Sequence, residues 1–181
     1  MINPILEQQK RELDKIEICM DILRNARNEL YLSMRFFDVI LSKLEFMPRT
    51  DIEGFATDGY YLYFYPDYVI GMYKRDPVKV NRSFLHMVFH CLFQHLDRAE
   101  DADAFYWDLA CDIVVESILD SLQKRSVRAY VSPYRKNIYH GLKKEMDVLT
   151  PKGVYKSIWN MQLGMEELAK MRLEFWADDH E

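Results

Sequence analysis

The sequence has few cysteines, no excess of basic residues and no long hydrophobic run. Its 181 residues include three cysteines, Cys19, Cys91 and Cys111, and no CxxC pair. An odd number without such a pair excludes a disulfide framework or a zinc ribbon and favours a reducing compartment. The 24 basic and 29 acidic residues give a formal net charge of −5, so no global basic field attracts nucleic acid or anionic lipid.

The uncharged stretches are too short to span a membrane. The longest, residues 83–96 with neutral histidines, falls short of the ~20 residues that a spanning helix needs. The polar N-terminus lacks the apolar core of a signal peptide, so we expect a cytoplasmic protein. Hydrophobic residues make up 49% of the chain and charged residues 29%, which excludes a disordered chain and, with this length, predicts a single domain over residues 1–181.

The spacing of apolar residues predicts a mostly helical chain with a small sheet. From Leu6 to Leu44 they recur at steps of three, four and seven, which predicts either one long helix over about residues 5–46 or two helices joined by a kink near residues 25–28. The turn Thr57-Asp58-Gly59 and the aromatic run behind it predict strands within about residues 52–65. The other predicted helices cover residues 67–73, 77–96, 104–122, 151–161 and 165–176, and residues 125–147 look irregular. The predicted fold class is α+β, predominantly helical.

Three histidines lie in the predicted helix over residues 77–96. His86 and His90 are one helical turn apart, about 40° around the axis, so both imidazoles can reach one metal ion. HExxH zinc hydrolases use the same spacing, and their glutamate after the first histidine activates the metal-bound water. A hydrogen-bonded pair in the core would show the same spacing. His95 would lie about 180° from His86 on a continuous helix, so we do not count it as a ligand unless the helix breaks first.

The next predicted helix offers carboxylates. Asp112 and Glu116 are one turn apart in an otherwise apolar stretch, and antiparallel packing of the two helices would place a carboxylate beside the imidazoles. Asp108 and Asp120 extend this row, which is also the pattern of a solvated acidic stripe. Like charges at this spacing repel by a few tenths of a kcal/mol each. Either a metal cation or an arginine from elsewhere in the fold, such as Arg98, would relieve that repulsion.

Three segments in this order resemble a known family. They are Ala56-Thr57-Asp58-Gly59 with its aromatic strand, Leu85-His86 followed by His90, His95 and Arg98, and Trp107-Asp108-Leu109-Ala110-Cys111-Asp112. Together they resemble the metallopeptidase domain of predicted bacterial metal-dependent peptidases, which usually carry a von Willebrand A-like domain behind it. The likeness covers about residue 26 to the C-terminus. The final Asp178-Asp179-His180-Glu181 is similar to the junction with that second domain.

The resemblance implies a zincin-like fold, in which a small sheet packs beside the histidine helix and the following helix supplies an acid. It implies that His86, His90 and Asp112 bind a divalent metal such as zinc, with Glu116 where the family tends to have asparagine. Met87 stands where the family has its general-base glutamate. Methionine cannot accept a proton, and general-base catalysis typically contributes ~10² to 10⁴ in rate. Enzymatic activity is therefore left open.

Three interpretations remain. We favour a degenerate metallopeptidase-like domain that still binds a divalent metal, has weak or no peptidase activity, and acts as a scaffold or binds a protein or peptide partner. A von Willebrand A-like domain outside this chain is one such partner. The second interpretation is an active metal-dependent hydrolase that uses Glu116 as its base. The third is a metal-free helical interaction module. None of the three involves nucleic acid or a membrane.

Overall fold

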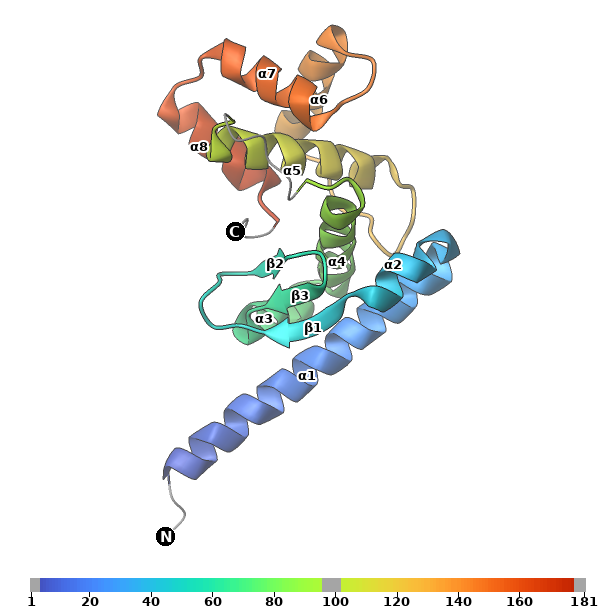
Figure 1. Cartoon of the computed structure of the whole chain (residues 1–181), viewed down its shortest axis with the longest axis vertical. Coiled ribbons are helices and arrows are strands. Elements are labelled where there is room, and N and C mark those ends of the chain that lie inside the picture. The colour runs from blue at the N-terminus through green and yellow to red at the C-terminus, as the bar shows by residue number, and fades with distance from the viewer. Residues whose placement is uncertain (1–3, 96–101, 178–181) are drawn as a thin grey trace. The chain divides into compact units, whose positions relative to one another are not determined.

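The computed structural model describes residues 4–95 and 102–177, and the chain forms two compact units, Met1–Val88 and Phe89–Ala177. The boundary falls inside one continuous helix, α4 (Pro77–Leu92) (Figure 1). Among the described residues, no helix combines the length and apolar character needed to cross a membrane.

The first unit begins with α1 (Pro4–Ser33), a single helix of 30 residues. Residues 4–14 are all exposed, and the helix then buries a row at helical spacing that includes Ile22, Ala26 and Leu30. Because α1 runs through residues 25–28 as one helix, the alternative of two helices joined by a kink there is wrong. The helix ends at Ser33 instead, and η1 (Arg35–Phe37) and α2 (Asp38–Lys43) follow it.

A three-stranded sheet comes next in the chain, with the order β1-β3-β2. Its strands are β1 (Glu45–Pro48), β2 (Phe55–Thr57) and β3 (Tyr61–Phe64). β2 pairs with β3 in antiparallel orientation, and both strands lie within residues 52–65, where strands were predicted. The helix predicted to about residue 46 is too long, because β1 pairs with β3 in parallel orientation, and this tertiary pairing overrides helix propensity.

A tight turn joins β2 to β3. Asp58 Oδ1 accepts hydrogen bonds from the backbone N–H groups of Tyr60 (2.9 Å) and Tyr61 (2.8 Å). Gly59 has φ 89°, a conformation that a side chain would strain. Beyond the turn, Leu62 is buried on one face of the sheet while Tyr61 is only half-buried on the other.

Two helices complete this part of the chain. α3 (Pro66–Arg75) packs against α1, and α4 begins at Pro77 after Asp76, whose side chain accepts a hydrogen bond from Val78 N. Every residue of α4 from 80 to 90 is buried. α4 ends at Leu92, four residues earlier than predicted. Gln94 adopts a left-handed conformation with φ 56°, which ends the helix and turns the chain back.

The second unit is built around α5 (Ala104–Ser121), which packs against α7 (Pro151–Met161) and α8 (Met165–Phe175). The core of this unit includes Ile113, Val154 and Phe175. Asp103 caps α5 by accepting a hydrogen bond from Tyr106 N, as the acidic residues before this helix predict.

Residues 125–147 were predicted to be irregular, and this prediction is wrong, because they contain α6 (Pro133–Glu145). The side chain of Ser132 caps this helix by accepting a hydrogen bond from Arg135 N, and Pro133 occupies the first turn. The same serine- or threonine-proline signal correctly predicts α7 at Thr150-Pro151. The chain is thus α+β and predominantly helical, as predicted.

Candidate metal centre

The two histidines of the predicted pair lie on α4, one turn apart and without a break between them. His86 is 0% exposed and His90 is 1% exposed. Because α4 is continuous through both residues, its local geometry alone places their side chains on one side of the helix. Buried imidazoles need polar partners, since each ring carries two nitrogen atoms that would otherwise lose their hydrogen bonds to water.

Asp112 of α5 meets this pair. Its Oδ1 lies 3.4 Å from Nε2 of His90, and the carboxylate is almost completely buried. One ligand atom from each of His86, His90 and Asp112 can be chosen so that all three lie within 4.8 Å of one another. The structure therefore brings together the three residues that the sequence analysis singled out as ligands.

These residues have the donor chemistry of a divalent-metal site. Two imidazole nitrogens and one carboxylate oxygen form the type of three-residue set found in catalytic zinc sites. An ion about 2.0–2.1 Å from each ligand atom, with tetrahedral angles, needs those atoms about 3.3–3.5 Å apart. The 3.4 Å between His90 and Asp112 already matches that separation. The residues present thus fit a divalent ion with small adjustments.

Met87 occupies the position after the first histidine and is 0% exposed. It is among the largest fully buried side chains of the chain. The position at which HExxH enzymes carry their base is therefore filled by an apolar side chain in the core. A thioether is only a weak hydrogen-bond acceptor and takes no proton near neutral pH.

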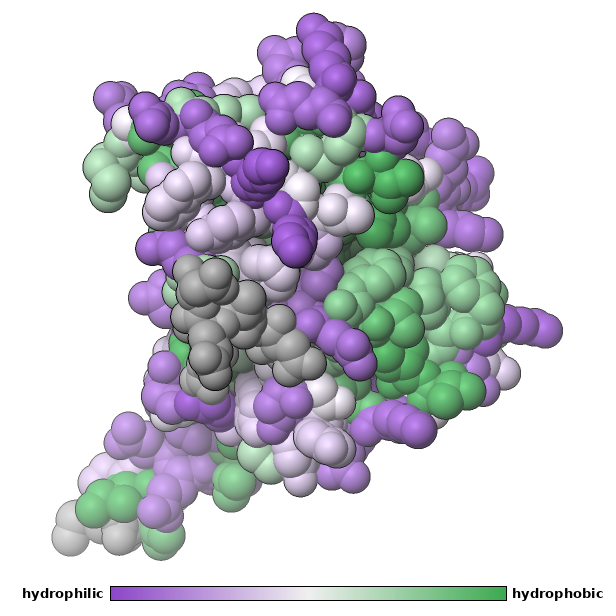
Figure 2. Space-filling view, turned by 45° about the horizontal axis from the view of Figure 1, so that its top comes forward, coloured by the Kyte–Doolittle hydropathy of each residue, from purple (hydrophilic) through white to green (hydrophobic). Residues whose placement is uncertain are grey.

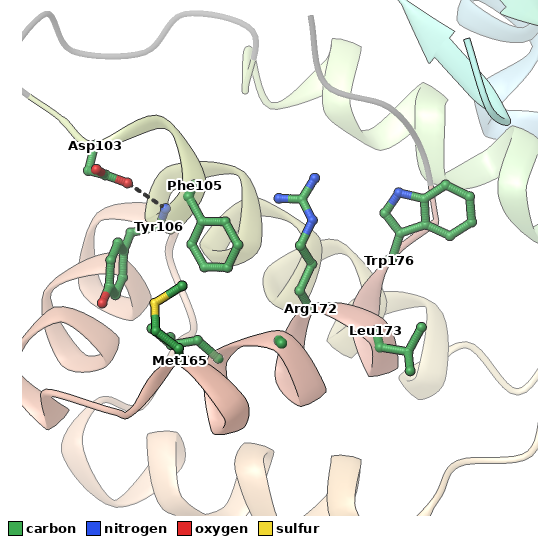
Figure 3. A pocket seen from close by; sticks show the side chains of 9 residues that line it. Asp103, Phe105, Tyr106, Met165, Arg172, Leu173 and Trp176 are labelled. Atoms are coloured by element: carbon green, nitrogen blue, oxygen red, sulfur yellow. Dashed lines mark hydrogen bonds between the residues drawn. The ribbon is translucent and has the colours of Figure 1, made fainter.

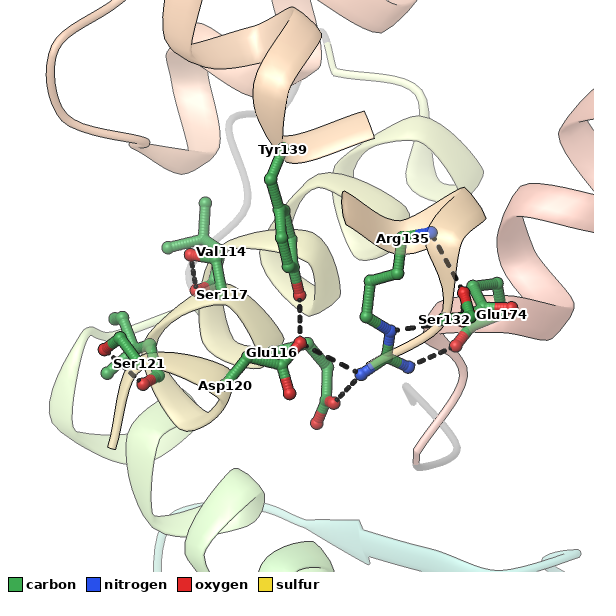
Figure 4. A network of polar contacts seen from close by, with 10 residues as sticks. Val114, Glu116, Ser117, Asp120, Ser121, Ser132, Arg135, Tyr139 and Glu174 are labelled. Atoms are coloured by element: carbon green, nitrogen blue, oxygen red, sulfur yellow. Dashed lines mark hydrogen bonds and ion pairs between the residues drawn. The ribbon is translucent and has the colours of Figure 1, made fainter. Parts of the chain in front are cut away.

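Glu116 points into a different cluster (Figure 4). Its Oε2 lies 2.5 Å from Nη1 of Arg135, and both side chains are largely buried. Arg135 also lies 3.5 Å from Asp120 and 3.3 Å from the Glu174 carboxylate, and it donates a hydrogen bond to the Glu174 backbone carbonyl. We call Glu116, Asp120, Arg135, Tyr139 and Glu174 the arginine cluster. Because Glu116 holds a buried cation, it is poorly placed to serve as a base.

Charge and burial act together in the arginine cluster. Burial by itself would lower the pKa of Arg135, but the nearby Glu116, Tyr139 and Asp120 raise it above its ordinary value, so the guanidinium stays charged. Tyr139 donates a hydrogen bond of 2.8 Å to Asp120. Burial, followed by the charge of Asp120, raises the pKa of Tyr139 far above its usual range, so the hydroxyl keeps its proton.

The acidic row of α5 is therefore not a solvated stripe. Glu116 is buried and paired with Arg135, which is one of several basic residues dispersed over residues 124–144. The sequence offered Arg98 as an example of such a partner, and Arg98 lies outside the described residues, as does the segment 178–181. The helix-start signal at Ser132-Pro133 would have placed Arg135 in the first turn of a helix.

A separate pocket in the second unit has different chemistry (Figure 3). It has a volume of about 590 Å³ and lies between the start of α5 and α8. Phe105, Leu168 and Trp176 are among its apolar lining residues, and the Arg172 guanidinium lies 5.2 Å from the centre of the Phe105 ring. This pocket suits an apolar group, and its lining residues offer no metal-ligand set. Figure 2 shows that hydrophobic side chains also reach the surface of the molecule.

The cysteines and His140 are the remaining candidate residues. Cys19 and Cys111 are buried, Cys91 is half-buried, and none of the three forms a disulfide bond. Burial raises the pKa of Cys19 to about 11, which keeps this thiol protonated and unreactive. The dipeptide His140-Gly141 suggests an exposed turn, but His140 lies at an exposed position of α6.

Comparison with known proteins agrees with this site. Residues 21–156, most of the chain, match the family described as "putative metallopeptidase domain". No match was found among curated proteins or among solved structures. With its two helix-borne histidines and the aspartate beside them, the chain belongs to this metallopeptidase-domain family.

Proposed function

We propose that this chain is a degenerate metallopeptidase-like domain with a zincin-like arrangement. It binds a divalent metal, with zinc as the expected ion, through His86, His90 and Asp112. It acts by binding a protein or peptide, with weak or no cleavage of it. The observation that carries the proposal is the meeting of three buried ligand atoms within 4.8 Å, next to a fully buried methionine at the base position.

A divalent ion held there would supply Lewis-acid chemistry, polarising a carbonyl group and lowering the pKa of a water molecule. The chain's own residues would hold the ion, but the position after His86 provides no group that takes a proton. Of the carboxylates predicted near the ion, Asp112 lies beside His90, and Glu116 is paired with Arg135. These contacts support a binding role over hydrolysis.

The partner and the compartment are also proposals. The resemblance supports a protein or peptide partner, with a von Willebrand A-like domain as one candidate. The cysteine content supports a reducing compartment such as the cytoplasm, because none of the three cysteines forms a disulfide bond. The acidic net charge of −5 supports neither a nucleic-acid nor a membrane partner.

Metal analysis of the protein purified without a histidine tag tests the metal. We expect about one zinc per chain, lost in His86→Ala and kept in His140→Ala, which removes an exposed imidazole on α6. A wild-type protein without stoichiometric metal after dialysis against zinc would overturn the proposal in favour of a metal-free interaction module.

A peptide library incubated with and without chelator tests the catalytic part. We expect no chelator-sensitive cleavage by the wild type. Cleavage that Glu116→Gln abolishes would establish the active hydrolase instead. Met87→Glu is the complementary variant, and gained, chelator-sensitive cleavage would reveal a site that lacks only its base. Because Met87 is 0% exposed, Met87→Gln serves as the matched folding control.

A further inference from the structure

We propose that His95 is a fourth protein ligand of the metal, so that the site is closed and has no position for substrate. This inference rests on the proposed function, since it adds a ligand to the same ion. Sequence reasoning set His95 aside because a continuous helix would carry it to the opposite side of the axis. In the structure, however, α4 ends at Leu92, before it reaches His95.

The break returns His95 to the histidine pair. α4 ends at Leu92, and Gln94 takes the left-handed conformation with φ 56°. The backbone N–H of His95 then donates a hydrogen bond of 3.0 Å to the carbonyl of His90, which folds the turn onto the helix end. His95 is consequently 7% exposed. A polar side chain directly after a helix would ordinarily point to water, so this burial places the imidazole on the inner side of the turn.

α5 holds the turn in this position. The indole N–H of Trp107 donates a hydrogen bond of 3.1 Å to the carbonyl of His95. Trp107 and Asp112 are on the same helix, so one rigid element contacts the turn and also supplies the carboxylate. The placement of His95 is thus coupled to that of Asp112 through α5.

The distance between the two imidazoles suits a shared ion. The ring centres of His90 and His95 are 5.1 Å apart, with the ring planes at 82°. Two imidazoles on one tetrahedral ion have ring centres about 5 Å apart, because each nitrogen lies about 2 Å from the ion and each ring centre about 1.2 Å beyond its nitrogen. His95 is not among the three residues whose ligand atoms lie within 4.8 Å, so its ring must turn about its side-chain torsions to direct a nitrogen at the ion.

Four protein ligands would change what the site can do. Structural zinc sites are closed by four protein ligands, whereas catalytic sites keep one position for water or substrate. A site of two α4 histidines, His95 and Asp112 would exclude water from the ion. The loss of the base at Met87 would then accompany the loss of the open position, and the metal would stabilise the fold or a binding surface.

Cobalt substitution tests this inference with a readout other than activity. The visible absorption of bound Co²⁺ reports the number and type of its ligands, and chelator competition gives the affinity. We expect His95→Ala to weaken Co²⁺ binding by more than ~100-fold, beyond the ~10–100-fold typical of groups that only support a ligand. We also expect it to change the visible bands, and added imidazole should restore them. The wild-type bands should not respond to imidazole.

Two matched variants keep this test decisive. His140→Ala removes an exposed imidazole and should behave as wild type. His95→Gln preserves most of the buried volume, and thermal unfolding of the metal-free proteins shows whether each variant folds. Wild-type bands in a folded His95→Ala or His95→Gln protein, or bands that imidazole alters in the wild type, would overturn the fourth ligand while leaving the three-ligand site intact. A wild type that binds no Co²⁺ or Zn²⁺ would overturn both proposals.

Discussion

α5 carries two buried carboxylate clusters about one helical turn apart, and they differ in what surrounds the acids. Asp112 meets imidazoles, and one ligand atom from each of His86, His90 and Asp112 lies within 4.8 Å of the other two. Glu116 and Asp120 meet the guanidinium of Arg135, a cation that the chain itself supplies. The comparison shows that a four-residue acidic repeat does not define one environment. Each acid takes its role from the side chains that contact it.

The largest effect is expected from removing the cation of the arginine cluster. Arg135→Met would leave buried carboxylates without their cation, and breaking a buried ion pair in this way costs ~3–5 kcal/mol of unfolding free energy. Urea denaturation measures the change. Arg24→Met is the matched control, because Arg24 forms an exposed pair with Asp21, and such a pair contributes at most about 0.5 kcal/mol.

If Arg135→Met does not fold, Arg135→Lys still decides the matter. It keeps the charge and loses the multiple contacts of the guanidinium, so we expect an intermediate loss of stability. A change below about 1 kcal/mol in Arg135→Met would show that the arginine cluster does not stabilise the unit.

The increase in unfolding free energy on zinc binding should depend on Asp112 and not on the arginine cluster. Zinc at a free concentration 100 times its dissociation constant is expected to raise the unfolding free energy by ~2.7 kcal/mol. Asp112→Asn should lose this increment, while Arg135→Lys should keep it on a lower baseline. Denaturation with and without zinc measures both values. An increment that survives Asp112→Asn would place the ion elsewhere.

A smaller effect is expected from the tyrosine of the arginine cluster. Tyr139→Phe removes the hydrogen bond to Asp120, and a bond to a charged acceptor contributes ~1.5–3 kcal/mol. We expect a loss near the lower value, because Asp120 also lies beside Arg135. Tyr60→Phe, at a position that is 77% exposed, is the control and should change stability by less than about 0.5 kcal/mol. Equal effects of the two variants would contradict the buried role of Tyr139.

The smallest effect concerns an exposed pair outside both clusters. The side-chain hydrogen bond from Arg49 lowers the pKa of Asp51 to about 2. Because the folded pKa lies below the unfolded value, the contribution of Asp51 to stability is present above about pH 4 and is lost as the pH falls through about 2. An NMR titration should show this midpoint and its return toward the ordinary value in Arg49→Ala. An unchanged midpoint would rule out Arg49 as the cause.

Local signals made much of this structure predictable. The Thr150-Pro151 helix start and the Asp58-Gly59 turn both depend on neighbouring residues, and both are found. The His86 and His90 pair is equally local, because four residues make one helical turn. β1 was missed since its conformation depends on pairing with β3 rather than on its own sequence.

Long-range and left-handed features were not predictable in the same way. Arg135 reaches Glu116 from a helix that begins after a long connection, so sequence spacing carried no signal for that pair. The return of His95 depends on the left-handed backbone of Gln94, a residue type that gives no warning of such a turn. Asp112 was predicted from the assumption that two adjacent helices pack together and from the family resemblance, because its own position in the sequence does not distinguish it from the neighbouring acids.

The beginning of α1 is exposed to solvent. Residues 4–14 are helical, yet none of them is buried. Their backbone hydrogen bonds depend on the helix alone, and an isolated segment of this length is only marginally helical in water. Amide hydrogens there should exchange with solvent long before those of the buried row from Ile22 to Leu30, so this end of the helix would fray while the rest stays folded.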